Sequence, residues 1–219
     1  MYWEEETNEE QYVVPDDVVD LLFKINCPTL PVDHAWDLSR AINEQLPWFS
    51  QQAGAGLHII HGADSGNGWE RPQGSEDLLH LSRRTRLTLR IPKHRIEEAS
   101  TLSGKTLLIS GHSMQIEEAK HRKLGMTSVV YSRYVVSSPE WSEDEFMSWA
   151  VAELKKQRLR FKKVLSGKTA EIATPDGPIS TRTLMVANMP IEDAVALQEQ
   201  GIGAHRTLGC GLFIPQKDF

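Results

Sequence analysis

The 219-residue chain has only two cysteines, few aromatic residues (7%) and no long apolar run. Two cysteines cannot build a disulfide framework or a four-cysteine zinc site, and the apolar neighbours of Cys27 and Cys210 predict buried thiols, so we expect no structural metal. A membrane helix would need about 18 consecutive apolar residues, and we expect no membrane partner. The opening MYWEEETNEE lacks the basic region and apolar core of a secretory signal, which predicts a cytoplasmic protein.

The net charge of −6 is unevenly distributed along the chain. Residues 1–40 hold ten acidic and two basic residues, and the first twelve, poor in aliphatic side chains, are expected to form a mobile acidic tail. Residues 81–123 hold ten lysines and arginines against four glutamates, and residues 155–168 hold seven without an acid. An acidic protein can still bind nucleic acid through such a local cationic stripe. The alternative is two solvated charged faces.

Apolar periodicity and turn residues predict the same β-α-β-β-α-β order twice. The first set comprises strands at 18–25, 57–61, 83–91 and 105–111, with helices that begin at Asp33 and Pro92. The second comprises strands at 128–136, 181–188 and 210–215, helices at 142–157 and 190–200, and a basic segment at 160–168 that leads to a turn at 175–177. This order is typical of the ferredoxin-like (RRM-like) α+β fold, an antiparallel sheet with two helices on one face. We therefore expect tandem ferredoxin-like domains at 13–120 and 124–219.

From Arg84 onward, arginines alternate with other residues along the predicted strand at 83–91. Because successive side chains of a strand point to opposite faces, we expect Arg84, Arg86 and Arg90, with Lys93 at the end, to form one cationic face. Arginine forks match phosphate oxygens and stack on bases, which favours RNA as the ligand. The alternative is an exposed arginine ladder without an anion, in which the like charges would repel one another.

Four glycines lie within the segment GIGAHRTLGCGLF near the carboxyl terminus. Gly201, Gly203, Gly209 and Gly211 flank His205 and Arg206, and this glycine-rich loop is expected to turn sharply and lie close to a phosphate. The segment LQEQGIGAHRTLGCGLFIP resembles the glycine-rich signature of the CRISPR-associated repeat-processing endoribonucleases, members of the RAMP superfamily. LPVDHAWDLSRAI, GLHIIHG and SRRTRLTLRIP are similar to the myxobacterial-type subgroup of that family.

The resemblance implies an enzyme that cuts precursor CRISPR RNA within each repeat and needs neither metal nor cofactor. A base would take the proton from a 2′-OH, which attacks the adjacent phosphorus, while an acid protonates the leaving 5′ oxygen. The products would carry 2′,3′-cyclic phosphate and 5′-OH ends. The resemblance also implies that the repeat stem-loop lies across a basic face, that the enzyme retains the hairpin product, and that other subunits of a CRISPR effector complex are partners.

Histidine suits the role of base because its ordinary pKa near 6.5 leaves both protonation states populated at neutral pH. His34, which matches the family position in the first predicted helix, is the first candidate, and His58 on the second predicted strand is the reserve. The alternatives are a surface helix-cap residue for His34 and a buried core residue for His58. His58 and His61 lack further ligands nearby, so a zinc site is not expected.

The remaining basic stretches supply further candidates for RNA binding: Arg133, Lys162, Lys163, Arg182, His205 and Arg206. Lys162 and Lys163 are expected near the hairpin that, in the family, grips the repeat stem; clustered cations suffice there because double-stranded RNA is recognised by shape and backbone. The alternative for the strand residues is simple solvation. Two other functions stay open: a non-catalytic RNA-binding subunit of a ribonucleoprotein, and a protein whose glycine-rich loop binds a phosphorylated metabolite.

Overall fold

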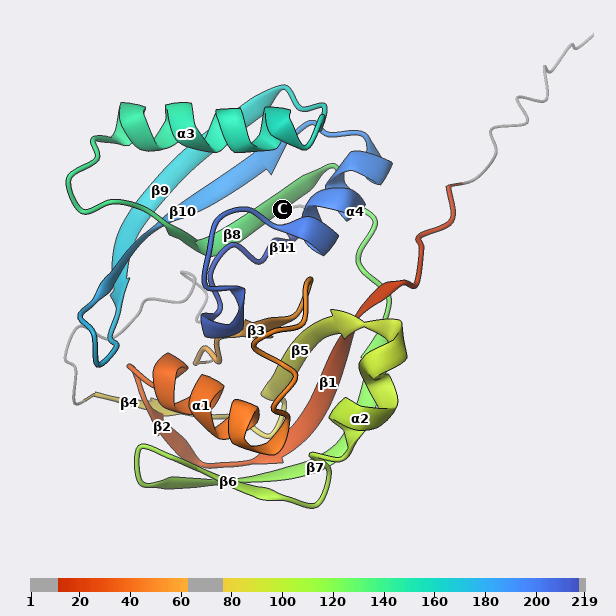
Figure 1. The fold of residues 1–219 in the computed structure, drawn as a ribbon, viewed down its shortest axis with the longest axis vertical. Helices are drawn as coiled ribbons and strands as arrows, with labels where there is room; N and C mark the ends of the chain where they lie inside the picture. Colours follow the sequence, from red (N-terminus) through yellow and green to blue (C-terminus); the bar gives the residue numbers. More distant parts are fainter. Residues whose placement is uncertain (1–11, 63–76, 217–219) are drawn as a thin grey trace, which may run out of the picture.

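The computed structural model describes residues 12–62 and 77–216, which form two ferredoxin-like units (Figure 1). The strands of the amino-terminal unit are β1 (Val18–Asn26), β2 (Thr29–Pro31), β3 (Gly56–His58), β4 (Leu78–His80), β5 (Arg86–Pro92), β6 (Thr106–Ile109) and β7 (His112–Arg122). Its helices are α1 (Ala35–Gln45) and the short α2 (Ile96–Ser100), which follows a 3-10 turn at Lys93–Arg95. The main sheet is antiparallel and has the order β3-β5-β1-β7-β6, while β2 and β4 pair separately.

Strand β1 shows why this sheet has one helix-covered face and one open face. Val19, Leu21 and Phe23 are at most 1% exposed and pack in the same core as α1 and α2. Full burial of such a side chain contributes about 1.5–3 kcal/mol relative to exposure. The intervening side chains of Asp20 and Lys24 belong to the other face, because side chains alternate along a strand. The open face of the sheet is therefore polar and charged.

The carboxy-terminal unit repeats the arrangement. It contains β8 (Val129–Val136), α3 (Glu143–Lys156), β9 (Lys163–Ile172), β10 (Ile179–Ala187), α4 (Ile191–Gln200), a 3-10 turn at Arg206–Leu208 and β11 (Ile214–Pro215). The sheet order is β11-β8-β10-β9. The predicted start of α3 is confirmed, since Ser142 Oγ accepts from Glu145 N at 3.2 Å and Glu145 Oε2 accepts from Ser142 N at 2.8 Å. The expected α+β fold with tandem antiparallel sheets is confirmed.

Strand β7 is the main difference from the expected elements. The sequence pattern assigned the fourth strand of the first unit to 105–111, but β6 pairs only with β7 at the sheet edge. The strand that completes the ferredoxin-like order beside β1 is β7, whose outer half is mostly solvent-exposed. Because β7 buries few side chains, among them Met114 and Ile116, its apolar periodicity is weak.

Two expectations concern parts of the chain that the fold does not test. The predicted acidic tail falls almost entirely on residues 1–11, which lie outside the described residues. The domain limits at 120 and 124 stay a prediction; β7 ends at Arg122 and β8 begins at Val129. Within the described ranges, no helix combines the length and the apolar content needed to cross a membrane.

Candidate functional site

A pocket of about 590 Å³ lies between the two units, over the open face of the first sheet. The amino-terminal unit and the segment that follows it line the pocket with Asp20, His58, Ile59, Ile60, His61, Gly62, Ser82, Arg84, Thr85, Arg86, Thr88, Arg122, Lys123 and Gly125. The carboxy-terminal unit contributes Gln198, Ile214 and Pro215. Among these lining residues, four lysines or arginines face a single carboxylate, that of Asp20. The pocket is therefore cationic and within the size range of ligand sites.

Two of the predicted arginines lie at this pocket. Arg84 is exposed in the turn before β5, and Arg86 begins the strand, with its guanidinium donating to Arg83 O at 2.9 Å and to Thr85 O at 2.8 Å. Arg86 also lines an adjoining pocket of about 300 Å³ on the same face, together with Lys24, Lys120 and Arg122. The cationic surface thus continues from β5 across β1 to β7.

Sequence reasoning missed the cations that β7 contributes to this surface. Lys120, Arg122 and Lys123 lie at and just beyond the end of β7, the strand that was not predicted. The signal was the basic run from Lys120 to Lys123, which counted toward the charge of residues 81–123 but had no assigned strand. Arg122 is 65% exposed and contacts Asp20 through Nη2 and Oδ2 at 3.3 Å, so most of its guanidinium faces solvent.

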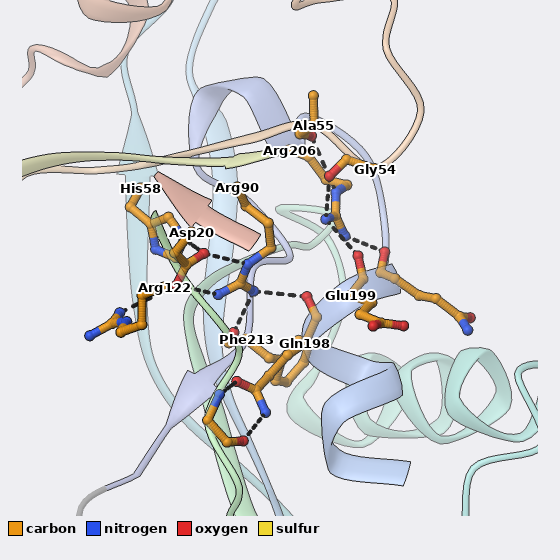
Figure 2. A network of polar contacts seen from close by, with 12 residues as sticks. Asp20, Gly54, Ala55, His58, Arg90, Arg122, Gln198, Glu199, Arg206 and Phe213 are labelled. Carbon is orange, nitrogen blue, oxygen red and sulfur yellow. Dashed lines mark hydrogen bonds and ion pairs between the residues drawn. The ribbon is translucent and has the colours of Figure 1, made fainter. Parts of the chain in front are cut away.

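The prediction that Arg90 binds RNA is wrong. Its side chain is fully buried, and Nε and Nη2 donate to the carboxylate oxygens of Asp20 at 2.8 and 3.2 Å (Figure 2). Its Nη1 donates to Gln198 O and Phe213 O at 2.8 and 2.7 Å. Alternation along β5 does place Arg90 on the open face, but the carboxy-terminal unit covers that end of the sheet.

Arg206 is half-buried and also forms hydrogen bonds within the protein, and RNA binding by Arg206 stays a prediction. Its guanidinium donates to Gly54 O at 3.1 Å, Ala55 O at 3.4 Å, Glu199 O at 2.9 Å and Gln200 O. Burial, together with the positive charge of Arg90, lowers the pKa of Arg206 to about 10, which leaves it protonated at neutral pH. Its neighbour His205 is exposed with a left-handed backbone, and RNA binding by His205 stays a prediction.

The glycine-rich loop packs tightly at its second glycine pair. A Cβ at Gly211 would lie 1.9 Å from Ile202 O, and one at Gly209 would lie 2.3 Å from Ile59 Cγ1. Both residues also have positive φ, at 65° and 91°. At Gly209 and Gly211 the close approach that was expected for a phosphate is made to the protein instead, because the loop closes on itself and on the amino-terminal unit.

The two candidate histidines occupy different environments. His34 is the N-cap residue of α1 and is fully buried, with Nδ1 2.8 Å from Pro31 O. His58 lies in the interdomain pocket with Nε2 3.5 Å from Asp20 Oδ1. Burial lowers the pKa of His58, and the carboxylate of Asp20 offsets only part of that effect, so the imidazole is neutral at pH 7. The structure therefore brings His58, rather than His34, together with Arg84 and Arg86.

The remaining candidates lie away from this pocket. Lys162 and Lys163 are exposed and lie at the start of β9, in the hairpin that β9 forms with β10, so their expected place near the hairpin is confirmed; they lie at the end opposite the turn between Ile172 and Ile179. The side chain of Arg182 is 15% exposed and lies 5.7 Å from the Phe146 ring, beneath α3. Arg133 stands 5.6 Å from the Tyr131 ring on β8, and Lys93 forms an ion pair with Asp16 beyond the other end of β5.

Tandem ferredoxin-like sheets with a cationic pocket between them are features of a protein that binds a polyanion such as RNA. The family model described as Cas6 Crispr matches residues 19–218, so the chain belongs to the Cas6 family. It is 26% identical over 206 residues to the CRISPR-associated endonuclease Cas6 of Myxococcus xanthus (strain DK1622), covering 90% of this chain and 81% of that protein.

Solved structures agree with the fold. A CRISPR associated protein Cas6 superposes with a TM-score of 0.63 at 12% identity, over 91% of this chain and all of that one. The Thermus thermophilus Cse3 bound to an RNA representing a pre-cleavage complex superposes with a TM-score of 0.51 at 12% identity, over 90% and 98% of the two chains. At these identities the likeness concerns the fold alone.

Proposed function

We propose that the protein cleaves precursor CRISPR RNA within its repeats by metal-independent attack of a 2′-OH, giving 2′,3′-cyclic phosphate and 5′-OH ends. Membership of the Cas6 family supports the reaction class. The observation that carries the mechanism is a neutral histidine, His58, in a pocket lined by Arg84, Arg86 and Arg122. A neutral imidazole accepts the 2′-OH proton, and the guanidinium groups stabilise the charge that develops on the phosphorane.

His58 and His34 are both proposed as catalytic residues, for different reasons. His58 lies among the cations, whereas His34 matches the family position and is the N-cap residue of α1, at a helix start where an anion is favoured. The backbone around His34 lies near the glycine-rich loop, since Ala35 packs in one cluster with Cys210. Losing a general base slows such a reaction by about 10²–10⁴-fold, which is large enough to separate the two candidates.

The substrate is proposed to be the repeat stem-loop, held by the cationic surface of the first sheet. Support comes from the RNA-bound Thermus Cse3, which shares the fold, and from the continuity of Arg84, Arg86 and Arg122 along two adjoining pockets. Retention of the hairpin product and assembly with other subunits of a CRISPR effector complex are proposed from family resemblance. A native gel that shows labelled product still bound after cleavage would support retention.

The test is a cleavage assay with labelled repeat RNA in EDTA, beside a substrate with a 2′-deoxy nucleotide at the cut site. We expect one cut that the deoxy substitution abolishes, and a product whose 3′ end resists labelling until the cyclic phosphate is removed. His34→Gln and His58→Gln are then compared under single-turnover conditions at saturating RNA. Tight binding without any cut by the parent protein would refute the enzyme and favour a non-catalytic RNA-binding subunit.

A further inference from the structure

Two arginines, one from each unit, converge on the end of α4: Arg90 is fully buried and Arg206 is half-buried (Figure 2). Arg90 of β5 reaches from the amino-terminal unit to Gln198 O and Phe213 O. Arg206 belongs to the glycine-rich loop; it donates to Glu199 O and Gln200 O, and also reaches across to Gly54 O and Ala55 O of the amino-terminal unit. We call Arg90 and Arg206 the inter-unit clamp.

The physical chemistry of a helix end explains why arginines suit this place. The last four carbonyls of a helix have no intrahelical donors, and the helix dipole makes this end partially negative. The clamp gives donors to three consecutive carbonyls, those of Gln198, Glu199 and Gln200. Asp20 supplies the counter-charge for Arg90, whereas the described hydrogen bonds of Arg206 all end on carbonyl oxygens.

The carbonyls that accept hydrogen bonds from the clamp lie on both sides of the glycine-rich loop in the sequence. Gln200 immediately precedes Gly201, and Phe213 follows Gly211 by two residues. Within the loop, Gly211 N donates to Tyr134 O at 2.7 Å, and Gly209 leaves no room for a Cβ against Ile59 of the amino-terminal unit. The position of the loop is thus set by contacts with the first unit as well as with its own.

The same network ends in the candidate site. Asp20, which pairs with Arg90, also lies 3.5 Å from His58 Nε2 and 3.3 Å from Arg122 Nη2. We propose that the inter-unit clamp acts as a pair of positioning residues, which hold the glycine-rich loop at a fixed place relative to the RNA pocket. This inference rests on the proposed cleavage activity, but its structural part is testable without it.

The primary variant is Arg206→Met, which keeps the aliphatic stem and removes the donors. Arg160→Met is the matched control, because Arg160 is exposed and pairs with Glu192 and Asp193 at the opposite end of α4. Hydrogen exchange is measured for the amides of residues 201–213. We expect at least tenfold faster exchange there in Arg206→Met, with the amides of β8 and β10 as protected as in the parent, and parental exchange in Arg160→Met.

Cleavage and binding then separate positioning from contact with RNA. At saturating RNA, we expect the single-turnover rate of Arg206→Met to fall at least tenfold. The slope of log affinity against log salt should stay unchanged, because no phosphate contact is lost. If Arg206→Met fails to fold, Arg206→Lys replaces it. Lysine keeps the positive charge but lacks the several donors of the guanidinium group, so we expect an exchange rate and a cleavage rate between those of the parent and those expected for Arg206→Met.

Three results would refute the proposal that the inter-unit clamp positions the glycine-rich loop. One is parental exchange and parental rate in the folded variant. The second is faster exchange across both units, which would mean a general loss of stability. The third is a salt slope reduced by about one unit, which would make Arg206 a phosphate ligand. If the parent itself cuts no RNA, the proposed activity fails, and the exchange experiment still decides whether the clamp holds the loop.

Discussion

Asp20→Asn is the substitution whose effect the structure defines most sharply. The carboxylate is 4% exposed and contacts Arg90, His58 and Arg122. Burial by itself would raise the pKa of Asp20, but the charge of Arg90, joined at acidic pH by that of protonated His58, outweighs that effect and holds the pKa well below its usual range. The variant therefore replaces an ionised partner with a neutral amide of the same shape, while Arg90 stays fully buried.

The size of the expected loss in stability follows from the buried charge of Arg90, which the variant leaves without an ionised partner. Removing one partner of a buried ion pair costs about 3–5 kcal/mol, and each kcal/mol lowers the unfolding midpoint of a chain of this size by about 2–4 °C. Thermal unfolding at pH 7, followed by circular dichroism, should show a midpoint about 6–20 °C below that of the parent. Glu118→Gln, which breaks the exposed ion pair with Lys24, is the control and should unfold near the parental midpoint.

The pH dependence of the unfolding midpoint tests whether the ionised carboxylate of Asp20 is the cause of this difference in stability. Because the folded-state pKa of Asp20 is depressed, its contribution is fully present above the unfolded pKa of about 3.9 and is lost as the pH falls below that value. The difference in midpoint between parent and variant should be constant above about pH 5 and should narrow progressively below about pH 4. A variant within about 2 °C of the parent at pH 7, or a difference that does not change with pH, would refute this account of the network.

Four further outcomes are expected. Gly211→Ala should lose about 1–3 kcal/mol or more in denaturant unfolding, because its Cβ would meet Ile202 O at 1.9 Å, whereas Gly104→Ala, at a similar positive φ but in open space, should lose about 1 kcal/mol. Arg122→Ala should weaken repeat binding and reduce the salt slope by about one, as measured by filter binding between 50 and 300 mM salt. Burial raises the pKa of the Cys210 thiol to about 12, so Ellman's reagent at pH 8 should label Cys210 only after unfolding. If His58 is the base, its lowered pKa means that the single-turnover rate should not change as the pH is lowered from 7 to 6.5. A rate that already falls at pH 7 would exclude His58 as the base.

The sequence predicted those elements whose signal is local. The capping residues Ser142 and Glu145 marked the start of α3, a short apolar run marked β1, and arginines alternating with other residues marked β5. Strand β7 was not predicted because seven of its eleven residues are exposed, so its sequence carries no regular apolar repeat. The tandem order was still recovered, because the remaining strands and helices follow one another in the ferredoxin-like order.

The site was predicted less well, because burial at an interface between distant segments leaves no local trace. Arg86 and Arg90 occupy equivalent positions of the strand pattern, yet Arg86 lines the pocket and Arg90 is enclosed by residues more than 100 positions away. The same holds for Arg206, which is held by carbonyls of Gly54 and Ala55. Periodicity assigns a side chain to a face of the sheet, but not to the part of that face that a second unit covers.

The row of charges across the first sheet shows how one face of the sheet both contacts the carboxy-terminal unit and presents a cation to the pocket. Asp20 on β1 lies directly between Arg90 on β5 and Arg122 on β7 in the strand register. One carboxylate cannot neutralise two guanidinium groups, and the shorter contacts go to the buried Arg90, where an unpaired charge would be most costly. Arg122, 65% exposed, therefore keeps most of its positive charge at the pocket. We expect an RNA phosphate to bind at Arg122, because Arg122 is exposed, whereas Arg90 is buried in the contact between the units.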